Sequence, residues 1–384
     1  MRFITLLPIQ VAVSCYKKMK KLLLIYILFL IGLSVQAQNT DTWIAFWDEE
    51  TKLMGFKDSN GQTMIEPQFM GFTIARKFDN IIAVMQDNNG KYETYYLTKS
   101  GKKVGLDSLH IYDNGADCES EGYIRFRDKK TDKVGMFDKN GKIVIPAVYN
   151  ELSRVQNGLI QALKGAEKKY WDEHRESGCN HFSWINGKEL LINTKNEVLI
   201  ENFQYKGNLN LFSLKISVKQ NDNPNRQSFV GKNGKIYSFI DYEKEFKNWI
   251  KQELLNSLSL DKLIKVSFDS ISYWKKPKGW LIEEKTNFLK RNFELIKNRF
   301  LELNTIEADY FISVDGLNPF IFQGKEYSKY YNNCGEPNTE KYPVMSLIIN
   351  NKINSGLIQD HFDFIRTDNG YKLISMTIRN GKIE

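Results

Sequence analysis

The sequence KVGMFDKNGKIVIPAVY at residues 133–149 decides the fold, because KLMGFKDSNGQTMIEPQF at residues 52–69 repeats its pattern. Counted from the first glycine, both stretches place Asp three residues on, Gly at six, Ile at ten and an aromatic residue at fourteen. Only the proline moves, by one position, between Pro67 and Pro146. This shared register predicts one folded unit that occurs at least twice.

The acid and the second glycine of each copy predict a tight turn. The carboxylate of Asp58 or Asp138 can accept a hydrogen bond from the backbone N–H two residues further on, which starts a turn. Gly61 or Gly141 can then adopt the left-handed conformation that closes it without steric strain. Each copy therefore predicts a β-hairpin.

The flanking residues predict the two strands of that hairpin. Gly55 and Gly135 lie inside the first strand, where glycine indicates a bulge or a close approach of another backbone. The isoleucine-containing segment after the turn is the returning strand. We expect Pro67 and Pro146 to end it, because proline has no N–H for the strand ladder.

Weaker forms of the turn recur along the chain. They start at Thr98, Thr194 and Gly231, in phase with the turns at residues 58 and 138. Most of these starts are about 40 residues apart, a spacing that is typical of repeat arrays. The longer interval between residues 138 and 194 holds a polar insertion, which we expect to be an exposed loop over residues 168–180. We therefore predict an all-β array of hairpin or meander units over residues 41–240, either propeller-like or an open solenoid.

The two copies resemble the WG (KWG) repeat family of bacterial proteins. That family combines an aromatic–Gly pair, a D-x-x-G turn, an Ile-Pro strand end and an aromatic residue with a following Gly-Leu-Ala-type strand. The last element is present as NGLIQA at 157–162 and more weakly as DNIIAV at 79–84. Met54 and Val134 replace the usual Trp. The resemblance covers about residues 52–163 well and 164–240 weakly; it implies a repetitive, often exported β module without a catalytic residue.

The amino terminus predicts export. Met19 opens a basic start, an apolar run follows from Leu22 to Val35, and Ala37 ends a small-residue cleavage motif. The run is shorter than the roughly 20 residues that cross a bilayer, so it indicates a cleaved signal peptide, with an uncleaved anchor as the alternative. Residues 1–18 are then an upstream extension, the true start being Met1 or Met19. We expect a secreted, periplasmic or cell-envelope protein.

Charge and cysteine content add two constraints. The chain carries 54 basic and 46 acidic residues, but five of the basic ones precede residue 38, which leaves a formal net charge of +3. That near-neutral balance argues against nucleic acid as a partner. Cys118, Cys179 and Cys334 remain in the exported part, so at most one internal disulfide and one thiol are expected.

The pattern changes after residue 240 and predicts an α+β domain at 241–384. Asp241 can cap one helix, and apolar residues at steps of three and four predict a second over residues 289–303. Period-two segments then predict strands at 310–314, 320–322, 344–349, 362–366 and 371–378, the last two joined by a turn at 368–370. Helices followed by an antiparallel meander resemble the cone-shaped fold of the nuclear-transport-factor family, which includes enzymes and interaction modules.

Two clusters are candidates for chemistry. His174, Cys179 and His181 could bind zinc if Cys118 or Asp172 supplied a fourth ligand, although an exposed loop is the interpretation that their polar setting favours. We predict no bound metal and no cofactor.

His361 and Asp363 share one face of a predicted strand and could do acid–base work. We expect Phe362 and Phe364 to fill the core and to leave the pair in solvent. No nucleotide-binding, protease or hydrolase motif occurs in the sequence.

The basic and aromatic residues at 275–280 could contact an anionic glycan or lipid head group, but a solvated loop is the simpler interpretation. The sequence favours a non-catalytic protein that binds or scaffolds a protein or glycan of the cell envelope. The alternative is a small-molecule-binding or hydrolytic C-terminal domain carried by a repeat platform. That alternative requires a concave pocket lined by groups such as His361, Asp363, Asp309 or Asp315. Membrane contact is expected only through an uncleaved amino terminus, and the sequence leaves the oligomeric state open.

Overall fold

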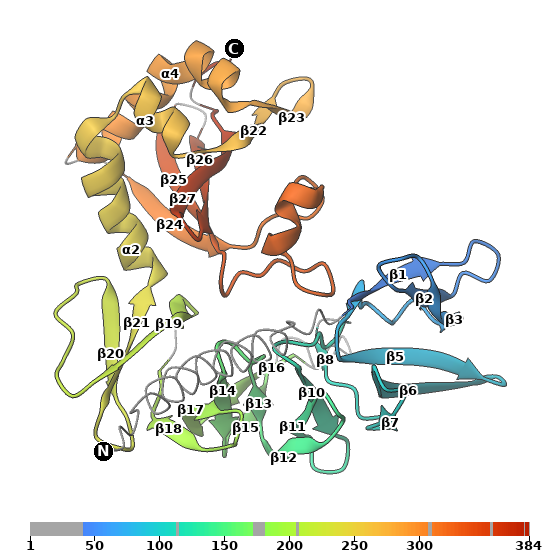
Figure 1. The fold of residues 1–384 in the computed structure, drawn as a ribbon. Coiled ribbons are helices and arrows are strands. Elements are labelled where there is room, and N and C mark those ends of the chain that lie inside the picture. Colours follow the sequence, from blue (N-terminus) through green and yellow to red (C-terminus); the bar gives the residue numbers. More distant parts are fainter. Residues whose placement is uncertain are drawn as a thin grey trace, which may run out of the picture. The chain divides into compact units, whose positions relative to one another are not determined.

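A computed structural model gives the fold of the chain (Figure 1), and Trp43–Glu384 form one compact unit in it. The predicted signal peptide and its cleavage site at Ala37 lie outside the described residues. No helix within the described part is long and apolar enough to cross a membrane. The residues that the structure describes are 41–112, 115–171, 181–204, 207–305, 309–353, 356–379 and 381–383.

The two sequence copies adopt the same hairpin. In the first, β2 (Met54–Lys57) pairs with β3 (Thr63–Phe69); in the second, β11 (Lys133–Asp138) pairs with β12 (Ile143–Tyr149). A preceding strand completes each unit: β1 (Trp43–Trp47) lies beside β2, and β10 (Tyr123–Asp128) lies beside β11.

Equivalent hydrogen bonds hold the two turns. Oδ1 of Asp58 accepts from the backbone N–H groups two and four residues on at 2.9 and 2.8 Å, and Oδ1 of Asp138 does the same at 2.9 and 2.9 Å. Gly61 and Gly141 have φ angles of 84° and 69°. The predicted turn is therefore confirmed in both copies.

The inner glycines lie where the strands come closest. A Cβ on Gly55 would lie 2.5 Å from the carbonyl oxygen of Ile65, and one on Gly135 would lie 2.7 Å from that of Ile145. The β2–β3 and β11–β12 registers shift at these glycines. Both the predicted close approach and the predicted bulge are present.

The prediction that the prolines end the returning strands is wrong. β3 runs through Pro67 to Phe69, and β12 runs through Pro146 to Tyr149. Both prolines fall inside the register shift, where the ladder of backbone hydrogen bonds is already interrupted. A missing N–H therefore costs no ladder bond there.

The other turns follow the pattern, with one correction. Turns close at Thr98–Gly101 and Gly231–Gly234 as predicted. The fourth turn starts at Asn193, one residue before the predicted Thr194, because the Asn193 carboxamide accepts the N–H groups that an Asp accepts elsewhere. Asn196, with φ 63°, takes the place of the closing glycine.

These turns organise the strands of residues 41–241 into several sheets, and β-strand is the main regular structure of the chain. The fifth turn joins β20 to β21, and here the strand after the turn is the centre of a three-stranded sheet, whereas β12 of the second copy lies at a sheet edge. The remaining strands of this region are β4 (Lys77–Phe78), β5 (Ile81–Asn88), β6 (Lys91–Thr98), β7 (Lys103–Val104), β8 (Ile111–Tyr112), β9 (Gly115–Ala116), β13 (Glu151–Leu152), β14 (Leu159–Lys164), β17 (Lys188–Asn193), β18 (Val198–Glu201), β19 (Leu209–Ser217), β20 (Arg226–Val230) and β21 (Ile236–Asp241).

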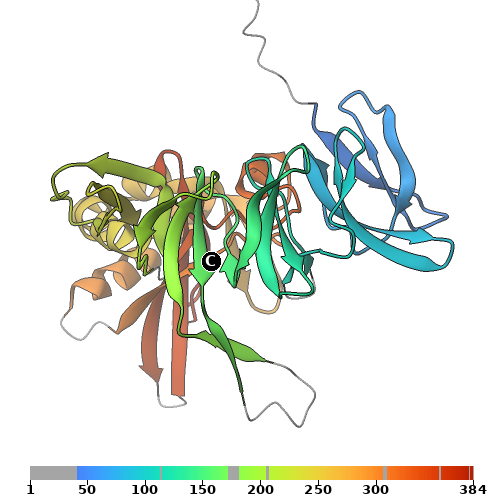
Figure 2. The same ribbon diagram turned by 90° about the horizontal axis from the view of Figure 1, so that it is seen from below.

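Where it is described, the predicted loop at 168–180 begins as a strand, and residues 172–180 lie outside the described residues. That strand, β15 (Glu167–Tyr170), pairs with β16 (Phe182–Ile185) as an antiparallel ribbon. Figure 2 shows this ribbon leading away from the neighbouring strands. The lysine and aromatic side chains of the two strands pack on each other, which gives a polar-looking sequence enough contact to form strands.

Residues 242–304 are mainly helical. Asp241 caps α2 (Tyr242–Trp249) by accepting the N–H of Lys244, as predicted, and π-helical and 3-10 turns continue it to residue 257. The second predicted helix is α4 (Lys285–Leu301). A short helix, α3 (Leu260–Lys265), and a hairpin of β22 (Ser267–Lys275) and β23 (Gly279–Glu284) lie between them and were not predicted.

One six-stranded sheet follows, in the order β23-β22-β27-β26-β25-β24. It is mixed rather than the predicted antiparallel meander, because β22 pairs parallel to β27. The segment 320–322 is not a strand; it precedes a 3-10 helix at 325–330. The strands not yet given are β24 (Tyr310–Asp315), β25 (Val344–Ile353), β26 (Gly356–Thr367) and β27 (Gly370–Thr377).

Aromatic and aliphatic side chains fill the space between the helices and this sheet. Phe288 and Phe300 of α4 meet Tyr273, Phe362 and Phe364 of the sheet, with ring centroids 4.5–6.3 Å apart. The four phenylalanines have no exposed surface. The prediction that Phe362 and Phe364 lie in the core is confirmed.

The segment between β24 and β25 contacts the repeat region. Cys334 forms a disulfide with Cys118, 216 residues earlier in the sequence. The carbonyl oxygen of Asn333 accepts from the backbone N–H groups of Arg76 and Lys77 at 2.8 and 2.9 Å. We call residues 331–338 the clasp segment.

Candidate functional site

The largest cavity described lies in the repeat region and has a volume of about 1110 Å³. Its walls come from β8 to β10, from the segment at β13 and from the β15–β16 ribbon, and Glu336 of the clasp segment also reaches it. We call it the ribbon cavity. Its charged lining residues, with the exception of Glu340, form two chains of ion pairs.

The first chain runs along the ribbon side. Lys168 contacts Asp132 at 2.6 Å, and Asp132 contacts Arg127 at 3.1 Å. Arg127 reaches Glu151 at 2.7 Å, and Glu151 lies 2.7 Å from Nε2 of His110. Burial alone would raise the pKa of Glu151, but its bond to His110 and the nearby arginine hold that pKa below the usual value.

The second chain centres on Asp117, whose side chain is fully buried. Arg125 donates to both of its carboxylate oxygens, and Nε of Arg154 donates to Oδ1 at 3.0 Å. Arg154 also contacts Glu336 at 2.6 Å. Burial would raise the pKa of Asp117, but Arg125 and then Arg154 hold it well below its usual range. Asp117 therefore stays ionised and fixes both arginines at the cavity wall.

Aromatic residues form another part of the wall. Phe182 and Trp184 lie two residues apart on β16, hence on one face of the ribbon. Their ring centroids are 5.1 Å apart, and the Lys168 ammonium group lies over both rings. Tyr112 of β8 also lines the cavity and is 81% exposed.

Two buried polar atoms at this cavity have no hydrogen-bond partner among the described residues. They are Nδ1 of His110 and Oε1 of Gln156. Both residues are more than nine-tenths buried. Buried polar groups are usually paired, so unpaired ones in a cavity wall are typical of a functional site rather than of a structural core.

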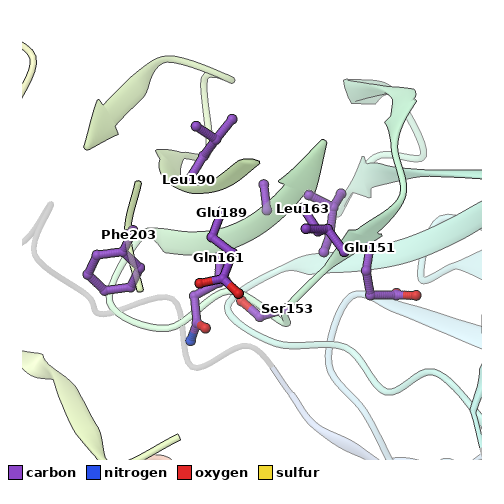
Figure 3. Close-up of a pocket in the computed structure, with 9 residues that line it drawn as sticks. Glu151, Ser153, Gln161, Leu163, Glu189, Leu190 and Phe203 are labelled. Carbon is purple, nitrogen blue, oxygen red and sulfur yellow. The ribbon is translucent and has the colours of Figure 1, made fainter. Parts of the chain in front are cut away.

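A smaller cavity of about 290 Å³ shares Glu151 and Ser153 with the ribbon cavity (Figure 3). Leu163, Leu190 and Phe203 supply much of its wall, and the Glu151 carboxylate points away from Gln161 and Glu189. That carboxylate belongs instead to the ion-pair chain of the ribbon cavity. Because the fixed charges gather there, the ribbon cavity is the better candidate site.

The candidate metal cluster is not supported by its described members. His174, Cys179 and Asp172 lie outside the described residues, while His181 stacks on Trp171 with ring centroids 5.9 Å apart and lines the ribbon cavity. Cys118, proposed as a fourth ligand, is bonded to Cys334. Within the described residues, no group of three or more His, Cys, Asp or Glu side chains is placed to hold a metal.

His361 and Asp363 do lie on one face of β26, but not in open solvent as predicted. Both are half-buried, because the segment before β25 covers this face with aromatic side chains around Ile365. Ser346 donates to Asp363 at 2.6 Å, and burial raises the pKa of Asp363 despite this bond.

The two other acidic groups that a catalytic pocket would need do not converge with His361 and Asp363. Asp309 accepts a bond from Asn350 at 2.9 Å, and Asp315 is exposed at the end of β24. None of the cavities described in this section is lined by His361, Asp363, Asp309 or Asp315.

The basic and aromatic segment at 275–280 is the tip of the β22–β23 hairpin rather than a plain loop. Trp274 and Trp280 face each other across it at 5.8 Å, and the two are 39% and 43% exposed. This cross-strand aromatic contact stabilises the hairpin.

Sequence reasoning missed the residues of the ribbon cavity. Their acids and bases are spread over residues 110–168 and 336–340 and form no local motif. One signal was available: in YIRFRD, Arg125 and Arg127 alternate with Ile124 and Phe126. That alternation puts two arginines on the face opposite the core.

Comparison with known proteins identifies the repeat. Residues 135–170 match a family model described as WG containing repeat. The match starts within the second sequence copy and supports a WG repeat protein that is rich in β-structure. Comparisons with curated proteins and with solved structures gave no match. None of these comparisons supports the resemblance to the nuclear-transport-factor family.

Proposed function

We propose that this chain is an exported binding or scaffolding protein whose repeat region presents the binding surface. The observation that carries the proposal is the ribbon cavity: its charges are fixed by ion pairs, and its wall joins adjacent units of the repeat region. A repeat array that holds such a cavity open is suited to recognition, because its lining is already in place before a ligand arrives.

Export is part of the proposal. The sequence at residues 19–37 has the order of a signal peptide, and the Cys118–Cys334 disulfide supports an oxidising compartment. If the proposal holds, mass spectrometry of the protein from its native cells finds Gln38 as the first residue and a peptide pair joined through the disulfide. A protein that retains residues 19–37 would favour the membrane-anchored alternative.

We propose further that residues 241–384 are a separate α+β domain of the cone-shaped type. Its own aromatic core and its six-stranded sheet support this. The packed phenylalanines between α4 and the sheet leave no room for the pocket that a hydrolytic function would need. The non-catalytic interpretation is therefore the one we favour.

Saturable binding tests the proposed function. Labelled mature protein (residues 38–384) should bind to an envelope preparation with a plateau, and unlabelled mature protein should displace it. A heat-denatured sample of the same protein serves as the control. Binding that rises linearly without displacement, in the wall, membrane and soluble fractions alike, would end the proposal.

A further inference from the structure

The ribbon cavity has a lining that selects one class of ligand. We propose that it binds a neutral oligosaccharide. The inference rests on the proposed binding function and goes beyond it by naming the ligand chemistry. It follows from three features of the cavity: the pairing of its charged side chains, its aromatic lining and its size.

All the acidic and basic side chains that line the cavity except Glu340 are already matched. Each of its four basic side chains, Arg125, Arg127, Arg154 and Lys168, contacts a carboxylate of the cavity. An anionic ligand would have to compete with those carboxylates, and a cationic one with the bases. A ligand without net charge has neither cost.

The same ion pairs leave hydrogen-bonding capacity for hydroxyl groups. A guanidinium group carries five N–H donors and a carboxylate about four acceptor positions, more than the contacts of Arg127 and Glu151 use. A hydroxyl group both donates and accepts, so it can bridge a base and an acid that already face each other. Sugars present many such groups on one ring.

The aromatic wall complements the other face of a sugar. Phe182 and Trp184 offer adjoining apolar surfaces on one side of the ribbon, and Tyr112 is exposed at the cavity. A pyranose ring has a face of C–H groups that packs on such surfaces, while its hydroxyl edge points toward polar side chains. Aromatic surface beside paired charges is the combination that a sugar ring requires.

The dimensions favour an oligosaccharide over a single sugar. The volume of about 1110 Å³ exceeds the usual range of small-ligand pockets, about 300–1000 Å³. Its lining includes Lys168 and His181 as well as Phe182 and Trp184 from the region of the β15–β16 ribbon. Several linked sugar units could therefore contact it together.

Titration of the mature protein with defined probes tests the inference. Calorimetry and tryptophan fluorescence would follow binding of neutral hexasaccharides with glucose, mannose, xylose or N-acetylglucosamine units, beside hexagalacturonate, polyglutamate and polylysine. We expect at least one neutral probe to bind, with a Kd that changes less than twofold between 50 and 500 mM NaCl. Binding that is limited to a charged probe and weakens with salt would overturn it.

Two tryptophans provide the matched variants. Trp184→Ala should weaken binding of the neutral probe by about tenfold or more, the loss typical of truncating an aromatic anchor. Trp280→Ala, at the partly exposed hairpin tip outside the cavity, should leave the Kd within twofold. If Trp184→Ala alters the circular dichroism spectrum, Tyr112→Ser takes its place. Unchanged binding in a folded cavity variant would refute the site.

The envelope assay separates the two proposals. A mature protein that binds the envelope saturably but none of the neutral sugars would refute the ligand class and leave the binding function intact. A protein that binds neither would refute both.

Discussion

At the scale of single residues, the segment 117–121 is the junction of the repeat region. Each of its side chains bonds to a different part of the chain: Asp117 to two arginines, Cys118 to Cys334, and Ser120 to the carbonyl oxygen of Val155. Glu119 accepts from the start of β5, and Glu121 accepts from the loop before β14. One short segment thus fixes several units at once.

Asp117 is the residue of this junction whose loss should cost most. In Asp117→Asn, two partly buried arginines lose a fully buried carboxylate partner, so we expect a loss of about 3–5 kcal/mol in the free energy of unfolding at pH 7. Urea unfolding of the mature protein measures it. Asp222→Asn, at an exposed position, should change it by less than about 0.5 kcal/mol. Equal values for the two variants would contradict the role of the buried pairs.

The depressed pKa of Asp117 predicts that the folded protein loses stability in acid. Because its pKa is depressed in the folded state, its contribution is present above the unfolded pKa of about 4 and is lost as the pH falls toward the folded value. The stability difference between wild type and Asp117→Asn should therefore shrink between pH 4 and pH 2. Unfolding curves at pH 7, 4, 3 and 2 test this, and a difference that stays constant would contradict it.

Asp363 predicts the opposite pH dependence. Burial raises its pKa, so its contribution to stability is present below the unfolded value and is lost as the pH rises through the folded one. Asp363→Asn should therefore raise the melting temperature at pH 7 and change it little at pH 3. Asn can still accept the hydrogen bond from Ser346. A lower melting temperature for the variant at pH 7 would show that the carboxylate is stabilising instead.

At the scale of elements, the turn rather than the strand defines the repeat. All five turns share their backbone hydrogen bonds, although their first residues are Asp, Thr, Asp, Asn and Gly. At Asn193 an amide takes the place of the carboxylate, so the fourth turn starts one residue before the predicted Thr194. Side-chain acceptors of similar reach can therefore substitute for one another at this position.

The two sequence copies should respond alike to loss of the acid. Asp58→Ala and Asp138→Ala each remove two hydrogen bonds from backbone N–H groups, and we expect each to lose about 1–2 kcal/mol of stability. Asp58→Asn and Asp138→Asn, which keep an acceptor, should lose less than half as much. Thermal unfolding compares the four variants; equal losses for Ala and Asn would show that the acceptor is not what matters.

At the scale of the whole molecule, the clasp segment adds a covalent tie. The Cys118–Cys334 disulfide closes a loop of more than 200 residues, and such closure restricts the unfolded chain. Cys118→Ser with Cys334→Ser should lower the free energy of unfolding by about 2–5 kcal/mol. Dithiothreitol should lower the melting temperature of the wild type and leave that of the double variant unchanged. A reductant effect in the double variant would point to another cause.

The sequence by itself determined the local structure. Asp, Gly and Asn positions specified the turns, and the apolar period specified α2, α4 and four of the five predicted C-terminal strands. These features depend on contacts between residues close in the chain, which a pattern records directly. The passage of β3 and β12 through their prolines was mispredicted, because it depends on a register shift against a partner strand.

Only the tertiary structure decided which distant residues meet. Nothing local places Asp117 against Arg154, Cys118 against Cys334, or Phe182 and Trp184 in the same cavity wall as Arg127. The parallel pairing of β22 with β27 is likewise a contact across about 100 residues. Such contacts are fixed by how whole units pack. For that physical reason the repeat could be predicted from its residues, whereas the candidate binding cavity became visible only in the folded chain.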